Sequence, residues 1–292
     1  MPSTSVSVIN YDVTLTFPIL CGVVMKRTSR MTMVRQQKWF DAHRRSIELD
    51  DVVYEPFWRV EDVRSSGNVT KIAHFFTPNR VMHLLSQNEL WMYLNLARNR
   101  NVVEIYEQYA IPLDYSIPIA IELGVKHPVY VGSKQIPIVQ TIDFVSTLAD
   151  GSLVAHPVKQ ESDSLRERTM EKLAIQHAYC DLECIEYQLV TSDELRTNRS
   201  ENLENIYRHR NAGQFVEHLF RSWLTHLASH LSDNRHERMS TLLQHSAVSS
   251  GIVCSTAVSL FYAALWNEQL EMDWGQRLKL EKPASILGVY TL

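Results

Sequence analysis

The amino-acid sequence predicts an α/β fold, with a mixed β-sheet flanked by helices, followed by a mainly helical C-terminal section. Three observations predict it: a well-marked helix start at Ser86, a succession of strand-like runs after that helix, and helical spacing after about residue 212. Of the 292 residues, 45% are hydrophobic and 21% are charged, as in a folded globular protein. A chain of this length is long enough for two domains.

The helix that follows Ser86 is the best-marked element. Glu89 stands three residues after Ser86, which is the spacing of a capping box. Leu85 and Leu90 occupy the positions of a hydrophobic staple around the same cap. We therefore expect a helix from Ser86 to about Asn99.

Strand-like runs follow this helix. They are Val102–Tyr109, Val139–Leu148 and Leu153–Lys159, with a turn at Asp150-Gly151. The Pro-rich segment between Ile111 and Pro137 is expected to form loops with at most short strands. A second helix, from about Leu165 to Leu182, precedes a further strand-like run at Ile185–Val190. The order helix, three strands, helix, strand is typical of a sheet flanked by helices.

The C-terminal third shows helical patterns. The polar stretch Thr191–Glu204 is interpreted as a linker to this part. Helical runs follow at Phe215–Leu231, Met239–His245 and Ala257–Leu270, and a Gly-centred pair near Trp274-Gly275 and Leu278–Leu280 is a candidate wing. We therefore divide the chain into an N-terminal extension with a basic arm (1–45), an α/β domain (46–205) and a winged-helix-like domain (206–292).

The N-terminal extension combines an apolar stretch with basic residues. The apolar stretch Val13–Val24 precedes the basic residues, which is the reverse of the order in a secretory signal. No apolar run is long enough to span a bilayer, so we expect a cytoplasmic protein with no membrane partner. The basic stretch Lys26–Arg45 is interpreted either as a solvated arm or as an arm that contacts phosphate.

Charge and composition limit the classes of function. The formal net charge is −4, whereas a protein that binds DNA unaided usually carries a basic excess. This argues against a stand-alone nuclease, but not against an enzyme that partner proteins deliver to DNA. The four cysteines include no Cys-x-x-Cys pair, and the chain has no Gly-rich phosphate loop, so neither a zinc ribbon nor a nucleotide site is predicted.

Three charged residues fall where the pattern predicts burial. Glu89 lies on the apolar side of its helix, Asp143 in the middle of a strand, and Lys159 at the end of the next strand. A buried charge without a partner is strongly unfavourable, so each of these residues requires a partner or a function. Two carboxylates can hold Mg²⁺, and a nearby lysine can orient water or stabilise transition-state charge. This combination is typical of phosphodiester hydrolysis.

Simpler interpretations of the same residues stay open. Glu89 can be explained as a helix cap alone. Asp143 can be one half of a structural ion pair with Lys159. The spacing by itself therefore indicates an α/β domain with an acidic site and no particular enzyme.

The order of several motifs resembles a known protein family. The motifs are Val60–Gly67 (VEDVRSSG), Val81–Leu90 (VMHLLSQNEL), Gly124–Pro128 (GVKHP), Ile142–Phe144 (IDF), Val158-Lys159 and Arg168–Leu173 (RTMEKL). Over roughly residues 54–190 this succession resembles the TnsA endonucleases of heteromeric cut-and-paste transposons. The blocks Leu-Leu-Ser-x-x-Glu-Leu and Arg-Thr-x-Glu-Lys-Leu are its most specific parts.

The resemblance implies a fold, an activity and partners. The fold is restriction-endonuclease-like, and the activity is Mg²⁺-dependent cutting, with one or two ions, of the 5′ (non-transferred) strands at transposon ends. The partners are transposon-end DNA, a TnsB-like transposase that cuts and joins the 3′ ends, and a TnsC-like AAA+ ATPase that the C-terminal domain contacts. The family's helix carboxylate falls on Glu89, its strand aspartate on Asp143 and its lysine on Lys159, and these are the catalytic residues that the resemblance implies.

One position departs from the pattern of this fold. Pro157, two residues before Lys159, stands where a Glu, Asp or Gln is usual. Proline offers no side-chain ligand and no ladder hydrogen bond, so we expect a bulge or an edge position there. The metal would then depend on Glu89, Asp143, the Val158 carbonyl and water. This departure motivates a second hypothesis, a catalytically weak or inactive scaffold that bridges transposase and ATPase.

Overall fold

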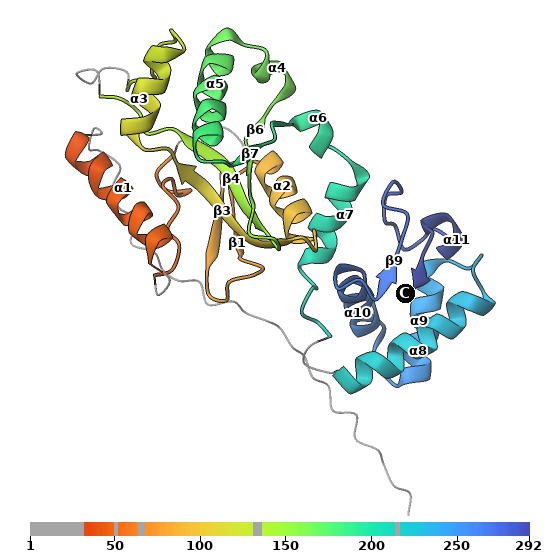
Figure 1. The fold of residues 1–292 in the computed structure, drawn as a ribbon. Helices are drawn as coiled ribbons and strands as arrows, with labels where there is room; N and C mark the ends of the chain where they lie inside the picture. Colours follow the sequence, from red (N-terminus) through yellow and green to blue (C-terminus); the bar gives the residue numbers. More distant parts are fainter. Residues whose placement is uncertain (1–31, 50–51, 64–67, 131–135, 214–216) are drawn as a thin grey trace, which may run out of the picture.

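The computed structural model describes residues 32–49, 52–63, 68–130, 136–213 and 217–292. A sheet with helices on both sides is followed by a smaller helical module at the C-terminus (Figure 1). The apolar stretch Val13–Val24, the basic residues before Thr32 and the end of the motif Val60–Gly67 lie outside the described residues.

The central sheet has four strands in the order β3-β4-β5-β7. They are β3 (Val102–Ala110), β4 (Thr141–Leu148), β5 (Leu153–His156) and β7 (Glu186–Tyr187). The β3–β4 and β4–β5 pairs are antiparallel and the β5–β7 pair is parallel. The predicted mixed sheet is therefore confirmed, and Gly151, with a φ of 86°, supplies the left-handed residue in the turn between β4 and β5.

Pro157 interrupts the sheet, as its missing N–H predicts. Strand β5 ends at His156, and the next residues form β6 (Val158–Lys159), which pairs in parallel with β8 (Val190–Thr191). The N–H of Val158 donates to the side chain of Asp143 at 2.7 Å instead of to the neighbouring strand. The chain thus leaves the main sheet just before Lys159.

Hydrophobic clusters lie on both faces of the sheet. One face packs against α2 (Gln87–Ala97) through Phe144, and the other packs against α5 (Glu167–Leu182) through Val145. Neighbouring residues of a strand point to opposite faces, so a strand covered on both sides must be apolar at successive positions. This accounts for the adjacent apolar residues Phe144 and Val145 of β4, a strand in which Asp143 is the one charged residue.

Two segments expected as loop or linker are helical. The Pro-rich segment contains α3 (Leu113–Glu122), in which Ile119 and Ala120 are buried against α5 despite Pro118 inside the helix. The segment expected as a linker forms α6 (Ser192–Leu195) and α7 (Asn198–Tyr207), and α7 packs on α2. In both segments tertiary burial of an apolar face outweighs weak local propensity.

Part of the expected basic arm is a docked helix, α1 (Met33–Glu48). Gln36 donates to the Pro137 carbonyl at 2.8 Å, and His43 accepts from the Ala110 N–H at 3.0 Å. The other ring nitrogen of His43 lies 2.8 Å from the Glu55 carbonyl, to which it donates. Burial lowers the pKa of His43 to about 4, so the ring is neutral, as one donor and one acceptor require.

In its described residues the C-terminal module contains three longer helices, one short helix and a pair of short strands. The helices are α8 (Glu217–Asp233), α9 (Met239–Ser250) and α10 (Cys254–Trp266), followed by β9 (Leu270–Glu271), α11 (Ala284–Leu287) and β10 (Tyr290–Thr291). Strands β9 and β10 pair, whereas the wing expected at Trp274–Leu280 lies in the loop between them. That loop is held by α7 instead, because the Asn202 side chain accepts from the Leu278 N–H at 2.8 Å.

Among the residues described here, no single helix is long and apolar enough to cross a membrane. Helices α9 and α10 would meet the length and composition together, but they are bent by 110° at the break between them.

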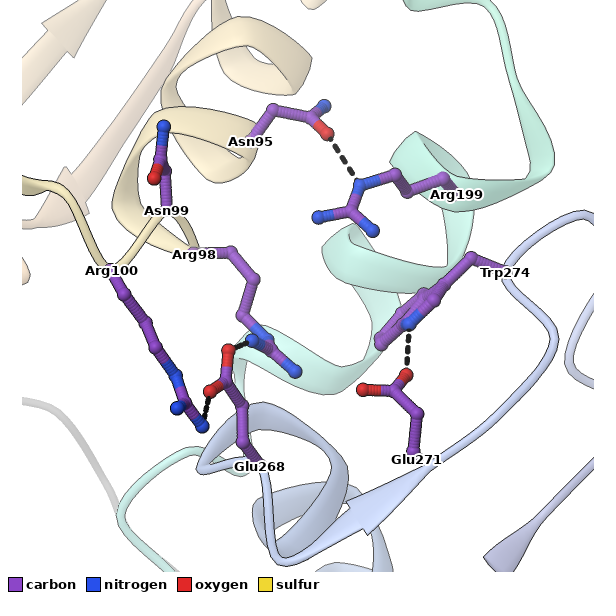
Figure 2. Close-up of a pocket in the computed structure, with 8 residues that line it drawn as sticks. All are labelled: Asn95, Arg98, Asn99, Arg100, Arg199, Glu268, Glu271 and Trp274. Atoms are coloured by element: carbon purple, nitrogen blue, oxygen red, sulfur yellow. Dashed lines mark hydrogen bonds and ion pairs between the residues drawn. The ribbon is translucent and has the colours of Figure 1, made fainter.

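The sheet domain and the C-terminal module meet at a polar cleft of about 450 Å³ (Figure 2). Arg98, at the end of α2, forms an ion pair with Glu268 and donates to the Leu265 carbonyl at 3.0 Å. Glu268 also pairs with Arg100, whose side chain is 75% exposed, whereas that of Arg98 is only 7% exposed. The Arg98 guanidinium lies 5.6 Å from the centre of the Trp274 ring.

Helix α7 packs on both α2 and α10, so the expected boundary at residue 205 falls inside an element shared by both parts (Figure 1).

We predict that Glu268→Ala destabilises the protein by roughly 1–3 kcal/mol, because it leaves Arg98 buried without a carboxylate partner. Urea unfolding measures the loss. Arg100→Ala is the matched control: it removes the exposed partner of the same carboxylate and should cost under about 1 kcal/mol. Equal losses of stability in the two variants would show that burial of Arg98 does not raise the cost of losing its carboxylate partner.

Candidate active site

Asp143 and Lys159 form a direct ion pair where β6 leaves the main sheet. The ammonium nitrogen of Lys159 lies 2.7 Å from Oδ2 of Asp143 and donates to the Val158 carbonyl at 2.9 Å. The Val158 N–H donates to the same Oδ2 at 2.7 Å. The side chains of Lys159 and Asp143 are 27% and 14% exposed, so solvent still reaches the pair.

Glu89 lies in the first turn of α2 and is 7% exposed. Its carboxylate accepts from the Leu85 N–H at 2.8 Å and from the Ser86 hydroxyl at 3.0 Å, while the Ser86 oxygen accepts from the Glu89 N–H at 3.2 Å. This is the expected cap with one difference: the carboxylate binds the N–H of Leu85, where a capping box would use that of Ser86. Capping fixes the Glu89 side chain at the helix start.

The three predicted residues are electrostatically coupled. Burial raises the pKa of Glu89 to about 7, and the negative charge of Asp143 raises it as well. The hydrogen bonds from Leu85 and Ser86 and the positive charge of Lys159 oppose this rise. Glu89 and Asp143 are therefore close enough to repel each other, and a cation near both carboxylates would relieve that repulsion.

The helix cap, the structural ion pair and the metal site would all involve the same side chains. Glu89 does cap α2, and Asp143 does pair with Lys159. Both carboxylates nevertheless come together in a largely buried place, where a structural role alone would be met at lower cost by uncharged polar groups. Such clustering of coupled titratable groups is typical of functional sites.

The donor set fits a hard divalent cation. The two carboxylates and the Val158 carbonyl all offer oxygen, the ligand type that Mg²⁺ prefers. Within the described ranges no group of three or more His, Cys, Asp or Glu is arranged to hold a metal. The remaining ligands would therefore be carbonyl or amide oxygens and water, which Mg²⁺ commonly retains. The Lys159 ammonium contacts two of the three expected ligand groups and supplies positive charge there.

Gln108 is a further polar residue at the carboxylates that sequence reasoning missed. It lies on β3 between Glu107, which pairs with Phe144, and Tyr109, which pairs with Ile142, and so is level with Asp143. Its side-chain amide nitrogen lies 3.4 Å from Oε2 of Glu89. The available signal was the adjacent pair Glu107-Gln108, since two successive polar residues break the alternation of a strand.

A second missed feature is a buried ion pair that involves Glu107, the residue before Gln108. Arg80 pairs with Glu107, and both are almost fully buried. Glu107 also accepts from the His83 N–H at 3.2 Å. These contacts hold the hairpin of β1 (Thr70–Ala73) and β2 (Val81–Leu84) against β3, directly before α2 begins. The pair therefore supports the segment that carries Glu89.

Comparison with known proteins gives two matches. Residues 99–192 match the family described as TnsA-like endonuclease N terminal; the match includes Asp143 and Lys159 and begins after Glu89. Over 156 residues the chain is 35% identical to the Escherichia coli protein named Transposon Tn7 transposition protein TnsA. That alignment covers 53% of this chain and 56% of the Escherichia coli protein, so the chain spans about half the length of the curated relative it matches.

We predict that Glu89→Gln changes the pH dependence of stability in the presence of a chelator. Because the pKa of Glu89 is raised in the folded state, the wild-type protein loses stability as the pH rises from about 4.5 to about 7. The amide does not titrate, so its stability relative to wild type should improve by roughly 1–3 kcal/mol between pH 5 and pH 8.

Urea unfolding at both pH values measures this difference. The exposed Glu122→Gln serves as the control, since the same chemical change at an exposed position should alter the pH dependence little. A stability difference between Glu89→Gln and wild type that is the same at both pH values would contradict the prediction.

Proposed function

We propose that this chain, which is TnsA-like over residues 99–192, is the endonuclease subunit of a heteromeric cut-and-paste transposase. It would cut the 5′ (non-transferred) strands at the ends of the transposon with the help of Mg²⁺. The observation that carries the proposal is the convergence of Glu89, Asp143 and Lys159 from three separate elements; the family match includes Asp143 and Lys159. The restriction-endonuclease-like type of fold is part of the same proposal, supported by the mixed sheet with helices on both faces.

The residues of the site suit hydrolysis of a phosphodiester. Glu89, Asp143 and the Val158 carbonyl would hold the metal, which when bound polarises the phosphate and lowers the pKa of an attacking water. Lys159 lies 2.7 Å from Asp143, so its ammonium can donate to water or to a phosphate oxygen beside the carboxylates. There it stabilises the negative charge that grows in the transition state. The Val158 N–H and the cap of α2 keep the two carboxylates in place.

The partners we propose are transposon-end DNA, a TnsB-like transposase and a TnsC-like AAA+ ATPase. The net charge of −4 supports delivery to DNA by partner proteins over binding by the chain alone. We assign the ATPase contact to the C-terminal module and interpret that module as winged-helix-like. The module begins with helix α8, which is followed by an isolated β-bridge at Arg238, helices α9 and α10, and the paired strands β9 and β10. This order supports the interpretation. A bacterial cytoplasm, without a membrane partner, is the compartment in which such a complex would work.

A second candidate is a scaffold that bridges transposase and ATPase without cutting efficiently. Pro157 is the observation that favours it. Proline contributes no side-chain ligand beside the Val158 carbonyl and breaks the strand that leads to Lys159. With fewer protein ligands, a metal would be held more weakly.

We predict that Asp143→Asn lowers 5′-strand cutting by at least about 100-fold while 3′-strand joining by the transposase persists. The amide keeps an acceptor for the Val158 N–H, so the loss should not come from unfolding. End-labelled transposon DNA incubated with the full set of partner proteins shows the two strands separately.

Asp181→Asn, which alters a carboxylate that is 72% exposed on α5, is the control and should cut as wild type does. Undiminished 5′ cutting by Asp143→Asn would refute the catalytic assignment. If the wild-type protein gives only 3′ joining, the scaffold function holds instead.

A further inference from the structure

Gln108 has an unusual backbone for a residue inside a strand. Its φ is 50°, in the left-handed region that non-glycine residues seldom adopt, and the residue is only 2% exposed. The conformation is held from outside, because the Gln108 carbonyl accepts from the Phe57 N–H at 3.3 Å and the Tyr54 hydroxyl donates to the Glu107 carbonyl at 2.8 Å. A strained residue that its surroundings hold in place is typical of functional sites.

The left-handed backbone places the Gln108 side chain between the two strands and the helix that form the site. Its amide oxygen accepts from the hydroxyl of Thr141 at 3.0 Å, and its amide nitrogen lies 3.4 Å from Oε2 of Glu89. An ionised carboxylate can only accept, so the nitrogen of the amide must face Glu89 and the oxygen must face Thr141. At 3.4 Å the contact with Glu89 is at the long end for a hydrogen bond.

The contact gives one oxygen of the Glu89 carboxylate, Oε2, a second donor. Oε1 is bound by the Ser86 hydroxyl, while Oε2 accepts from the Leu85 N–H and from Gln108. Two donors on Oε2, one from the chain before α2 and one from β3, fix the rotation of the carboxylate. A carboxylate held in this way keeps a defined orientation, and Asp143 lies level with Gln108 on the paired strand.

We propose that Gln108 is a positioning residue, which sets the orientation of Glu89 for cation binding, with Thr141 setting the orientation of the Gln108 amide. The inference rests on the proposed function, because it concerns the same pair of carboxylates. Partners that orient a metal-binding carboxylate commonly change metal affinity by 10-fold to 100-fold when they are removed. Loss of Gln108 should therefore weaken the binding of Mg²⁺ by about that factor without removing any direct ligand.

Two substitutions at position 108 separate orientation from folding. Gln108→Gly and Gln108→Ala both lose the amide, but glycine tolerates a φ of 50° and alanine does not. We expect Mg²⁺ affinity, measured by calorimetry on the full chain, to fall about 10-fold to 100-fold equally in both variants. Thermal unfolding in a chelator should give a higher midpoint for the glycine variant than for the alanine variant.

A purely structural role for Gln108 predicts a different result, in which Mg²⁺ affinity follows the order of stability and the glycine variant binds better than the alanine variant. That result, or wild-type affinity in either variant, would overturn the inference. Thr141→Val tests the second link: it should weaken Mg²⁺ binding by a smaller factor, and Thr141→Ser, which keeps the hydroxyl, should restore it. Equal affinity of Thr141→Val and Thr141→Ser would remove Thr141 from the proposal.

The same titration distinguishes this inference from the proposed function. Glu89→Gln and Asp143→Asn should abolish Mg²⁺ binding if the carboxylates hold the metal. If wild type and both of these variants give the same binding, or none, the metal site itself is wrong and the proposed function fails with it. If only the position 108 variants bind as wild type does, the proposed function stands and the positioning role of Gln108 is refuted.

Discussion

Two carboxylates that repel each other lie close together at the end of the sheet, and one ammonium group partly compensates them. Burial and the charge of Asp143 raise the pKa of Glu89 to about 7, and Lys159 opposes that rise. Much of the surrounding structure holds this unfavourable arrangement in place. The cap of α2 fixes Glu89, and the Val158 N–H fixes Asp143. Such an arrangement lowers the stability of the fold, and it is common at sites that bind a cation or stabilise a developing charge.

Pro157 and the buried ion pair of Arg80 and Glu107 also help to hold the site in place. Proline ends β5, and because it cannot donate to β4, the next residue turns its N–H to Asp143. The chain then pairs with β8, and Lys159 reaches the carboxylate from outside the main sheet. The ion pair of Arg80 and Glu107 ties the hairpin before α2 to β3. Pro157 thus offers no side-chain ligand, but it also creates the strand break that positions Lys159.

Much of the α/β domain could be predicted from local pattern. The helix after Ser86, strand β3 and helix α5 have clear periodicity or caps, and all three were predicted close to their observed ends. Glu89, Asp143 and Lys159 were singled out because charge inside an apolar pattern requires a partner. The helices α3 and α7 were missed, because Pro118 in one and the many polar residues in the other obscure the few apolar residues that form the buried face.

The sequence by itself determined the types of the best-marked elements, the charges inside apolar patterns and the interruption at Pro157, because these depend on side-chain polarity, spacing and the missing proline N–H. Only the tertiary structure decided that Gln108 contacts Glu89, since that contact requires a left-handed φ which residue type does not reveal for glutamine. It also decided that Arg98 and Glu268 join the two parts of the chain. Such contacts link residues far apart in sequence, and no local pattern encodes which distant partner a charged side chain will meet.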